Sequence, residues 1–138
     1  MKKILGMGNA LTDILLQIDN DDVLSSLNLL KGGMQLINTE RSEEINDSVS
    51  NYAKKMATGG SASNTINGIT RLGMKAGFVG KIGKDDIGLF FTNDSINNGV
   101  VPHLLLSETP SGHCTVLVSP DSERTPCCSS WKWESHEE

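Results

Sequence analysis

Two adjacent glycines, Gly59 and Gly60, constrain the folding of this 138-residue chain more than any other feature. Glycine has no Cβ, so it adopts backbone angles that other residues reach only at a cost, and it lets a ligand approach the main chain. The run Ser61–Asn64 is compatible with the first turn of a helix, and Asn64 offers both a donor and an acceptor. Because a helix N-terminus presents unpaired amides, this stretch predicts a grip for a small polyhydroxylated ligand. An ordinary loop before a helix is the alternative interpretation.

Strand-like and helix-like segments alternate along the chain. Short apolar runs typical of buried strands occur at residues 4–8, 14–18, 34–37, 76–80, 100–106 and 113–118. Helical spacing of apolar residues occurs between them, at 22–27, 39–56, 62–72 and 87–96. This alternation indicates βαβ units and a mainly parallel sheet, and therefore an α/β fold.

Local signals predict where these helices begin and end. Asn38 or Thr39 can cap a helix whose apolar face runs from Ile45 to Met56. Gly73 fits the stop position of the helix that follows the glycine pair. An aspartate in the turn 83–86 is placed to cap the helix after it.

Composition excludes several classes of partner. The formal net charge is −5, and lysines and arginines are scattered, so no nucleic-acid surface is expected. No apolar run approaches the roughly 20 residues that span a bilayer, so no membrane partner is expected. The apolar stretch at the N-terminus is too short for a signal peptide, which favours a cytoplasmic protein. The three cysteines, two of them adjacent, do not make a disulfide framework.

Residues 126–138 depart from this pattern and are expected to form an atypical tail. They hold both tryptophans and two of the three cysteines, and they show no helical or strand periodicity. A tail that docks elsewhere, a metal-binding tail and residues translated out of frame are the three explanations. A metal site needs about four ligands. Cys127, Cys128 and His136 supply at most three, so no metal site is expected.

Several short motifs follow one another in a definite order. They are Gly6–Asp13, Gln35, Gly59–Asn64, Lys81–Gly83, Asp85–Gly88, Ser111–Cys114 and Asp121–Thr125. Over residues 1–125 the chain resembles the N-terminal part of the ribokinase-like (PfkB) family of sugar and nucleoside kinases, and within it the adenosine kinase branch. The resemblance implies part of a ribokinase-like three-layer α/β sandwich, with a small β-sheet lid formed partly from N-terminal strands.

The resemblance also implies which residues would bind the sugar. Asp13 matches an aspartate that binds the ligand's hydroxyls, and a carboxylate can accept two hydrogen bonds from a vicinal diol. Gly60, Ser61 and Asn64 match the residues on the other side of the sugar. A turn or helix-cap role is the alternative for Asp13.

Four further residues match family positions less specifically. Asn9 and Gln35 correspond to positions near the base or sugar in the nucleoside-using branch, with ordinary polar loop residues as the alternative. Cys114 corresponds to a pocket position on a lid strand, and a small apolar core residue is its alternative. Arg124 corresponds to an arginine near the transferred phosphate, where a guanidinium offsets charge, or is a solvated turn residue.

The family's catalytic machinery has no counterpart here. Its base is an aspartate in a Gly-Ala-Gly-Asp-type segment of the C-terminal half, where most of the ATP site also lies, and neither this segment nor a P-loop occurs in the sequence. The complete enzyme would use ATP and Mg²⁺ to phosphorylate a primary hydroxyl of a sugar or nucleoside. This chain is expected to be a truncated copy without kinase activity of its own.

Two other functions stay open. The chain could be a non-catalytic fragment that binds a sugar or nucleoside. An NAD-binding domain is suggested by the glycines at 6 and 8, but Leu11 stands where a third glycine is required. A truncated core would leave one edge and one face of its sheet uncovered, so a homo-oligomer or another association through that edge is expected.

Overall fold

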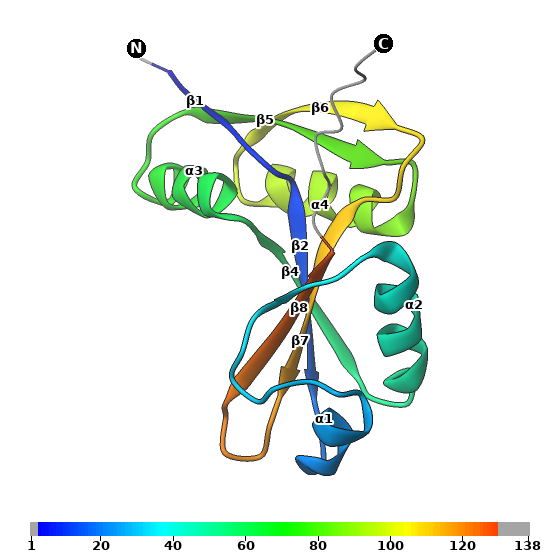
Figure 1. The fold of residues 1–138 in the computed structure, drawn as a ribbon. Coiled ribbons are helices and arrows are strands. Elements are labelled where there is room, and N and C mark those ends of the chain that lie inside the picture. Colours follow the sequence, from blue (N-terminus) through cyan, green and yellow to red (C-terminus); the bar gives the residue numbers. More distant parts are fainter. Residues whose placement is uncertain (1–2, 130–138) are drawn as a thin grey trace.

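The computed structural model describes residues 3–129, which form two sheets joined by short connections. Figure 1 shows a three-stranded sheet above two helices and a five-stranded sheet, the lid sheet, extending below them. The three-stranded sheet has the order β1-β5-β6, with β1 at Ile4–Met7, β5 at Ala76–Gly83 and β6 at Val101–Ser107. The lid sheet has the order β3-β8-β7-β2-β4, with β2 at Leu11–Gln17, β3 at Gln35–Leu36, β4 at Lys54–Gly59, β7 at Gly112–Val118 and β8 at Arg124–Ser129. The helices are α1 at Asp22–Ser26, α2 at Thr39–Ser48, α3 at Ser61–Arg71 and α4 at Asp86–Asn97.

Helices α3 and α4 cover one face of the three-stranded sheet (Figure 1). Phe78 of β5 and Phe91 of α4 are both about 1% exposed, and their ring centroids lie 5.7 Å apart. Helix α3 approaches β1 so closely that a Cβ on Gly6 would lie 2.5 Å from Cγ1 of Ile66. The opposite face of this sheet carries exposed apolar side chains at Leu5, Met7, Val101 and Leu105.

Strict alternation along β2 divides the lid sheet into two faces. Ile14 and Leu16 point into a core that is shared with α1 and α2 and includes Leu24 and Ile45. Asp13 and the other odd-numbered residues of β2 lie on the opposite, open face, as the two-residue period of a strand requires. The lid therefore has its own hydrophobic core and one face free for another role.

The expected α/β architecture with a separate lid sheet is confirmed, and so are three predicted helix ends. The lid sheet is not small, because it has five strands against three in the other sheet. The Oδ1 atom of Asn38 accepts a hydrogen bond from the Arg41 amide at 2.8 Å, which caps α2. The Oδ1 atom of Asp85 accepts one from the Gly88 amide at 2.8 Å, which caps α4. Gly73 follows α3 with a φ of +87°, a left-handed conformation that suits glycine. Within residues 3–129, no helix is long and apolar enough to cross a membrane.

The helix expected over residues 39–56 is wrong beyond Ser48. Helix α2 ends there, and Met56 lies in strand β4, opposite Ile14 of β2. Met56 does pack on the same core as Ile45, so its apolar character reflects burial. It reaches that core from a strand after a turn, and spacing along the sequence cannot distinguish this from a longer helix.

Two further expectations need correction. Only the three-stranded sheet is parallel throughout, because β2 pairs with β4 and β7 pairs with β8 in the antiparallel sense. Regular structure also continues past Thr125, since β8 runs to Ser129 and pairs with β7. The rest of the predicted tail, residues 130–138, lies outside the described residues.

The packing of β2 predicts a contrast between neighbouring leucines. Leu16 is 0% exposed in the lid core, whereas Leu15 is partly exposed on the open face. We expect Leu16→Ala to lower the free energy of unfolding by about 2–5 kcal/mol, through lost burial and the cavity left behind. Leu15→Ala should cost clearly less. Urea denaturation of both variants tests this, and equal losses would contradict the assignment of faces.

Candidate functional site

Asp13 lies on the open face of the lid sheet, in strand β2, which lies between β4 and β7. It is in register with Ala57 of β4 on one side and Cys114 of β7 on the other. Its side chain is half-buried. The face alternation described above places it away from the lid core, where the even-numbered residues of β2 pack.

The Asp13 carboxylate occupies space that exists only because residue 59 is a glycine. A Cβ built on Gly59 would lie 2.6 Å from Oδ2 of Asp13 and 2.7 Å from Oδ1. Real Cβ atoms do not approach other atoms so closely. The first glycine of the pair therefore makes room for the carboxylate.

The second glycine turns the chain from β4 into α3. Gly60 has φ +91° and ψ 140°, a conformation found almost only in glycine. A Cβ there would lie 2.9 Å from the backbone oxygen of Asn9, so the β1–β2 connection passes directly beside it. Ser61 is the first residue of α3, and the Asn64 amide donates to the Gly60 carbonyl at 2.9 Å. The backbone of Asn9 and the carboxylate of Asp13 thus lie beside the glycine pair, and Ser61 and Asn64 follow it in the first turn of α3.

The charge of Asp13 has little to stabilise it. No donor within residues 3–129 makes a hydrogen bond to this carboxylate, and only burial and the charge of Arg124 act on it. Burial raises its pKa above the usual range, and the positive charge of Arg124 opposes this shift only in part. A half-buried carboxylate without hydrogen-bond donors is a strong acceptor for hydroxyl groups that a ligand would bring.

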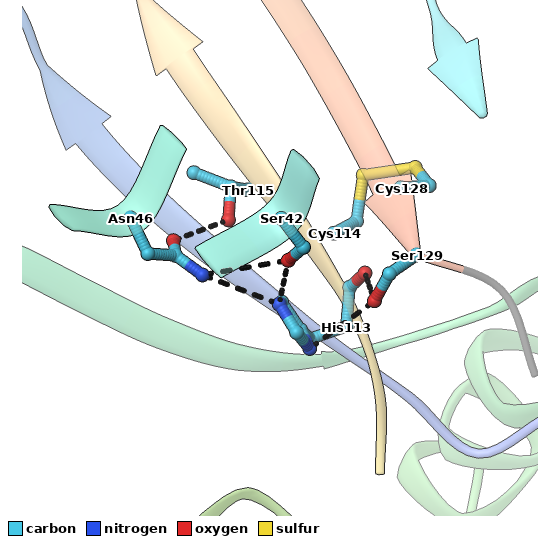
Figure 2. The surroundings of a disulfide bond; sticks show 7 residues. All are labelled: Ser42, Asn46, His113, Cys114, Thr115, Cys128 and Ser129. Atoms are coloured by element: carbon cyan, nitrogen blue, oxygen red, sulfur yellow. Dashed lines mark hydrogen bonds between the residues drawn. A yellow bond between two sulfur atoms is a disulfide. The ribbon is translucent and has the colours of Figure 1, made fainter. Parts of the chain in front are cut away.

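The structure replaces the expected Cys114 thiol with a disulfide. Cys114 is buried and bonded to Cys128, directly opposite it on β8 (Figure 2). This pairing also corrects the expectation that the cysteines form no disulfide. It was not predictable without β8, the strand that brings Cys128 opposite Cys114. Cys127 alternates onto the lid core, where burial raises the pKa of its thiol and so disfavours the reactive thiolate.

Gln35 and Arg124 do not join the cluster around Asp13. Gln35 is in register with Cys127, which places it on the face of the lid core, opposite Asp13. Leu36, 71% exposed, takes the open-face position instead. Arg124 is exposed at the start of β8, and its link to the site is the electrostatic effect on Asp13.

Sequence reasoning missed a polar cluster on the covered face of the lid sheet. The Nε2 atom of His113 lies 2.7 Å from Oγ of Ser42, and Asn46 accepts a hydrogen bond from Oγ1 of Thr115 at 2.9 Å (Figure 2). Ser42 and Asn46 are four residues apart on α2, the spacing that puts two side chains on one helix face. Ser42 is 3% exposed, so a ligand cannot reach it and the cluster fastens α2 to the sheet.

Residues that could bind a metal ion are not grouped in the described part of the chain. Within residues 3–129, no three His, Cys, Asp or Glu side chains come together as a metal site.

The sequence and the fold of this chain both match a known protein family. The family model described as "pfkB family carbohydrate kinase" matches residues 28–134 of this chain. The chain belongs to the pfkB family of carbohydrate kinases, and its fold is ribokinase-like.

Individual relatives include both nucleoside and sugar kinases. The structure of adenosine kinase from Sinorhizobium meliloti is 33% identical with a TM-score of 0.76, and the match covers 92% of this chain and 38% of that one. A probable sugar kinase protein from Rhizobium etli is 32% identical with a TM-score of 0.77, at the same coverage of both chains. A curated 5-dehydro-2-deoxygluconokinase from Geobacillus kaustophilus is 35% identical over 71 residues, which are 51% of this chain and 21% of that protein. The chain thus spans well under half of the proteins it resembles.

The contact between Asp13 and Gly59 predicts opposite effects for two glycine substitutions. We expect Gly59→Ala to lower the free energy of unfolding by about 1–3 kcal/mol, because the added methyl overpacks against the carboxylate. Gly68 lies within α3 with nothing within 4 Å of an added Cβ. Gly68→Ala should therefore stabilise the chain by about 0.5–1 kcal/mol. Thermal melts of both variants test this, and a neutral Gly59→Ala would contradict the close contact.

The raised pKa of Asp13 predicts a specific pH dependence. The folded chain holds this proton more tightly than the unfolded chain, so the group's contribution to stability falls as pH rises from below 3.8 through the raised pKa. Asp13→Asn removes this term. We expect the stability of Asp13→Asn relative to the wild type to increase between pH 3 and pH 7 in urea titrations. A constant or shrinking difference would contradict the burial penalty.

Proposed function

We propose that this chain carries the acceptor-binding part of a pfkB-type kinase and that Asp13 binds the hydroxyls of a sugar or of a nucleoside's ribose. One observation carries this proposal. A half-buried carboxylate with a raised pKa and no hydrogen-bond donor among residues 3–129 lies beside a glycine turn and the start of a helix. Such a group has an unsatisfied acceptor capacity that a vicinal diol matches.

The chemistry of binding follows from the two carboxylate oxygens. Two adjacent hydroxyls each donate one hydrogen bond to Asp13, and both bonds favour its charged form. Ligand binding therefore lowers the pKa of Asp13 and offsets the penalty of its burial. The unpaired amides in the first turn of α3 can donate hydrogen bonds to oxygens of the ligand. The side chain of Asn64 adds one hydrogen-bond donor group and one acceptor.

Phosphoryl transfer requires parts that this chain does not provide. In the complete enzyme, ATP would donate the phosphoryl group with Mg²⁺ bound to it, and Arg124 would offset charge near the transferred phosphate. The described residues form no carboxylate cluster for a metal, and the sequence holds no match to the family's base segment. We infer that the chain alone binds an acceptor without phosphorylating it.

A nucleoside is the first candidate ligand and a simpler sugar is the second. The adenosine kinase from Sinorhizobium meliloti matches 92% of this chain at 33% identity, which supports a ribosyl ligand. The 35% identity to a 5-dehydro-2-deoxygluconokinase supports a carbohydrate acid or sugar. A thermal-shift panel of adenosine, inosine, ribose and fructose distinguishes the two classes.

Self-association is part of the same proposal. Leu5, Met7, Val101 and Leu105 are 56–71% exposed on one face of the three-stranded sheet. An apolar face of this kind lowers its free energy by removal from water, and a second copy of the chain can cover it.

The acceptor site predicts a loss of binding at one aspartate and not at another. We expect Asp13→Asn to weaken adenosine or ribose binding at least about tenfold, because hydrogen bonds to a charged acceptor are lost. Asp19→Asn, an exposed position beyond the far end of β2, should bind like the wild type. Isothermal titration calorimetry measures both affinities.

A coupled assay for ADP tests the catalytic half of the proposal. We expect no sugar-dependent ADP release from the purified chain. Turnover by the chain alone would contradict the inferred lack of phosphoryl transfer. In the calorimetry described above, equal affinities of Asp13→Asn and the wild type would contradict the proposed acceptor site.

A further inference from the structure

Helix α4 and its N-cap residue hydrogen-bond to the chain at both strands that flank β2, to the residue just before β7 and to Thr58 of β4. Strand β2 carries Asp13 and lies between β7 and β4 in the lid sheet. Helix α4 does not pack in the lid sheet's core as a whole but covers the three-stranded sheet (Figure 1). Two of its carboxylates, the N-cap Asp85 and Asp94, reach across to the lid strands.

Asp85 binds the chain where β7 begins. Its Oδ2 accepts a hydrogen bond from the Ser111 amide at 2.8 Å, and its Oδ1 accepts one from Oγ of Ser111 at 2.7 Å. Oγ of Ser111, a residue that is 2% exposed, also accepts a hydrogen bond from the Gly83 amide at 2.8 Å. These bonds outweigh burial and hold the pKa of Asp85 below its usual range, with Gly88 contributing the helix-cap bond. The end of β5, the start of α4 and the start of β7 are thus one closed network.

Glycines make this network possible. A Cβ on Gly83 would lie 2.5 Å from the Thr109 carbonyl oxygen and 2.7 Å from the Ser111 nitrogen. A Cβ on Gly88 would lie 2.5 Å from the Gly83 carbonyl oxygen. The turn 83–86 and the motif Asp85–Gly88 that were noted in the sequence therefore form a close junction between the three-stranded sheet and the lid sheet.

Asp94 binds the other flanking strand just before the glycine pair. Its Oδ2 accepts a hydrogen bond from Oγ1 of Thr58 at 2.8 Å and a longer one from the Thr58 amide at 3.4 Å. Asn67 of α3 donates to the same Thr58 hydroxyl at 3.3 Å. Thr58 precedes Gly59, so this contact fixes the backbone that lies against Asp13.

We propose that Asp85 and Asp94 are positioning residues that set the orientation of the lid sheet, and with it the distance from Asp13 to the N-terminus of α3. Strand β2 is held on both sides by strands whose ends are tied to one helix, so it cannot swing without breaking one of these ties. The inference rests on the proposed function, because the geometry it protects is that of the acceptor site.

The test compares Asp85→Asn with Asp86→Asn in the full chain. Asp86 is the exposed neighbour on the same turn, so this control removes a charge and leaves the network intact. Hydrogen exchange read by mass spectrometry measures local opening in each variant. We expect exchange at residues 107–113 to rise about tenfold in Asp85→Asn, the fold-change for losing a hydrogen bond to a charged acceptor. Exchange in the lid interior at 14–17 and 115–118 should not change.

Ligand affinity is the second measurement and separates positioning from general stability. Asp85→Asn should bind adenosine or ribose at least about tenfold more weakly than Asp86→Asn at a temperature where both are fully folded. If the wild type binds and Asp85→Asn binds equally well, the positioning role is overturned. Exchange that rises uniformly across both sheets overturns it too.

Two arrangements keep the test decisive. If Asp85→Asn does not fold, Ser111→Ala retains the cap bond to Gly88 and carries the same expectation. If the wild type binds none of the four ligands in the panel, the proposed function fails, and the exchange pattern alone decides whether Asp85 holds the lid sheet in place.

A separate pair of variants tests Asp94. Asp94→Asn keeps an acceptor for Thr58 and should exchange more slowly at residues 54–60 than Asp94→Ala. Equal exchange in these two variants would count against the hydrogen bond between Asp94 and Thr58 as a positioning contact.

Discussion

The candidate site depends on the missing side chain at position 59. Strand register puts Asp13 beside β4, and only a glycine at the end of β4 leaves room for the carboxylate at 2.6–2.7 Å from where a Cβ would be. The next residue, Gly60, then turns the chain into α3 in a conformation that other residues rarely adopt. One glycine makes space for the acidic group, and the other directs the helix towards it. The pair has two distinct roles, which explains why both positions lack a side chain.

Sequence patterns predicted the elements whose signals are local. Helix α3 was predictable from its apolar spacing and its glycine stop, and the cap of α4 from an aspartate at the right offset. The family resemblance, which preserves order along the chain, suggested Asn9, Asp13, Gly60, Ser61 and Asn64 as ligand-binding residues, and that role stays a prediction. What failed required knowledge of pairing between distant strands. Strand β8, with Pro126 and two cysteines, shows no strand periodicity and is defined by its partner β7.

Gln35 shows the same limit at a single residue. A strand of two residues carries no alternation from which its faces could be predicted. Its register with β8 puts Gln35 level with Cys127 on the covered side, and Leu36 on the open side. A shift by one residue would exchange the two, so nothing short of the pairing itself decides which side chain can meet a ligand.

The lid and the rest of the molecule have separate hydrophobic cores, and this explains why polar contacts control their arrangement. The core of the lid sheet contains Leu16 and Ile45, and the core beneath the three-stranded sheet contains Phe78 and Phe91. Ile87 of α4 is partly buried and packs against the lid core. Hydrophobic contact is non-directional, so two separate cores do not by themselves define their relative angle. Hydrogen bonds require aligned donors and acceptors, and the ties from α4 supply such bonds at both strands beside β2. If Asp85 and Asp94 act as proposed, directional bonds at the junction set the position of Asp13 relative to the start of α3, and the packing of each core alone would not set it.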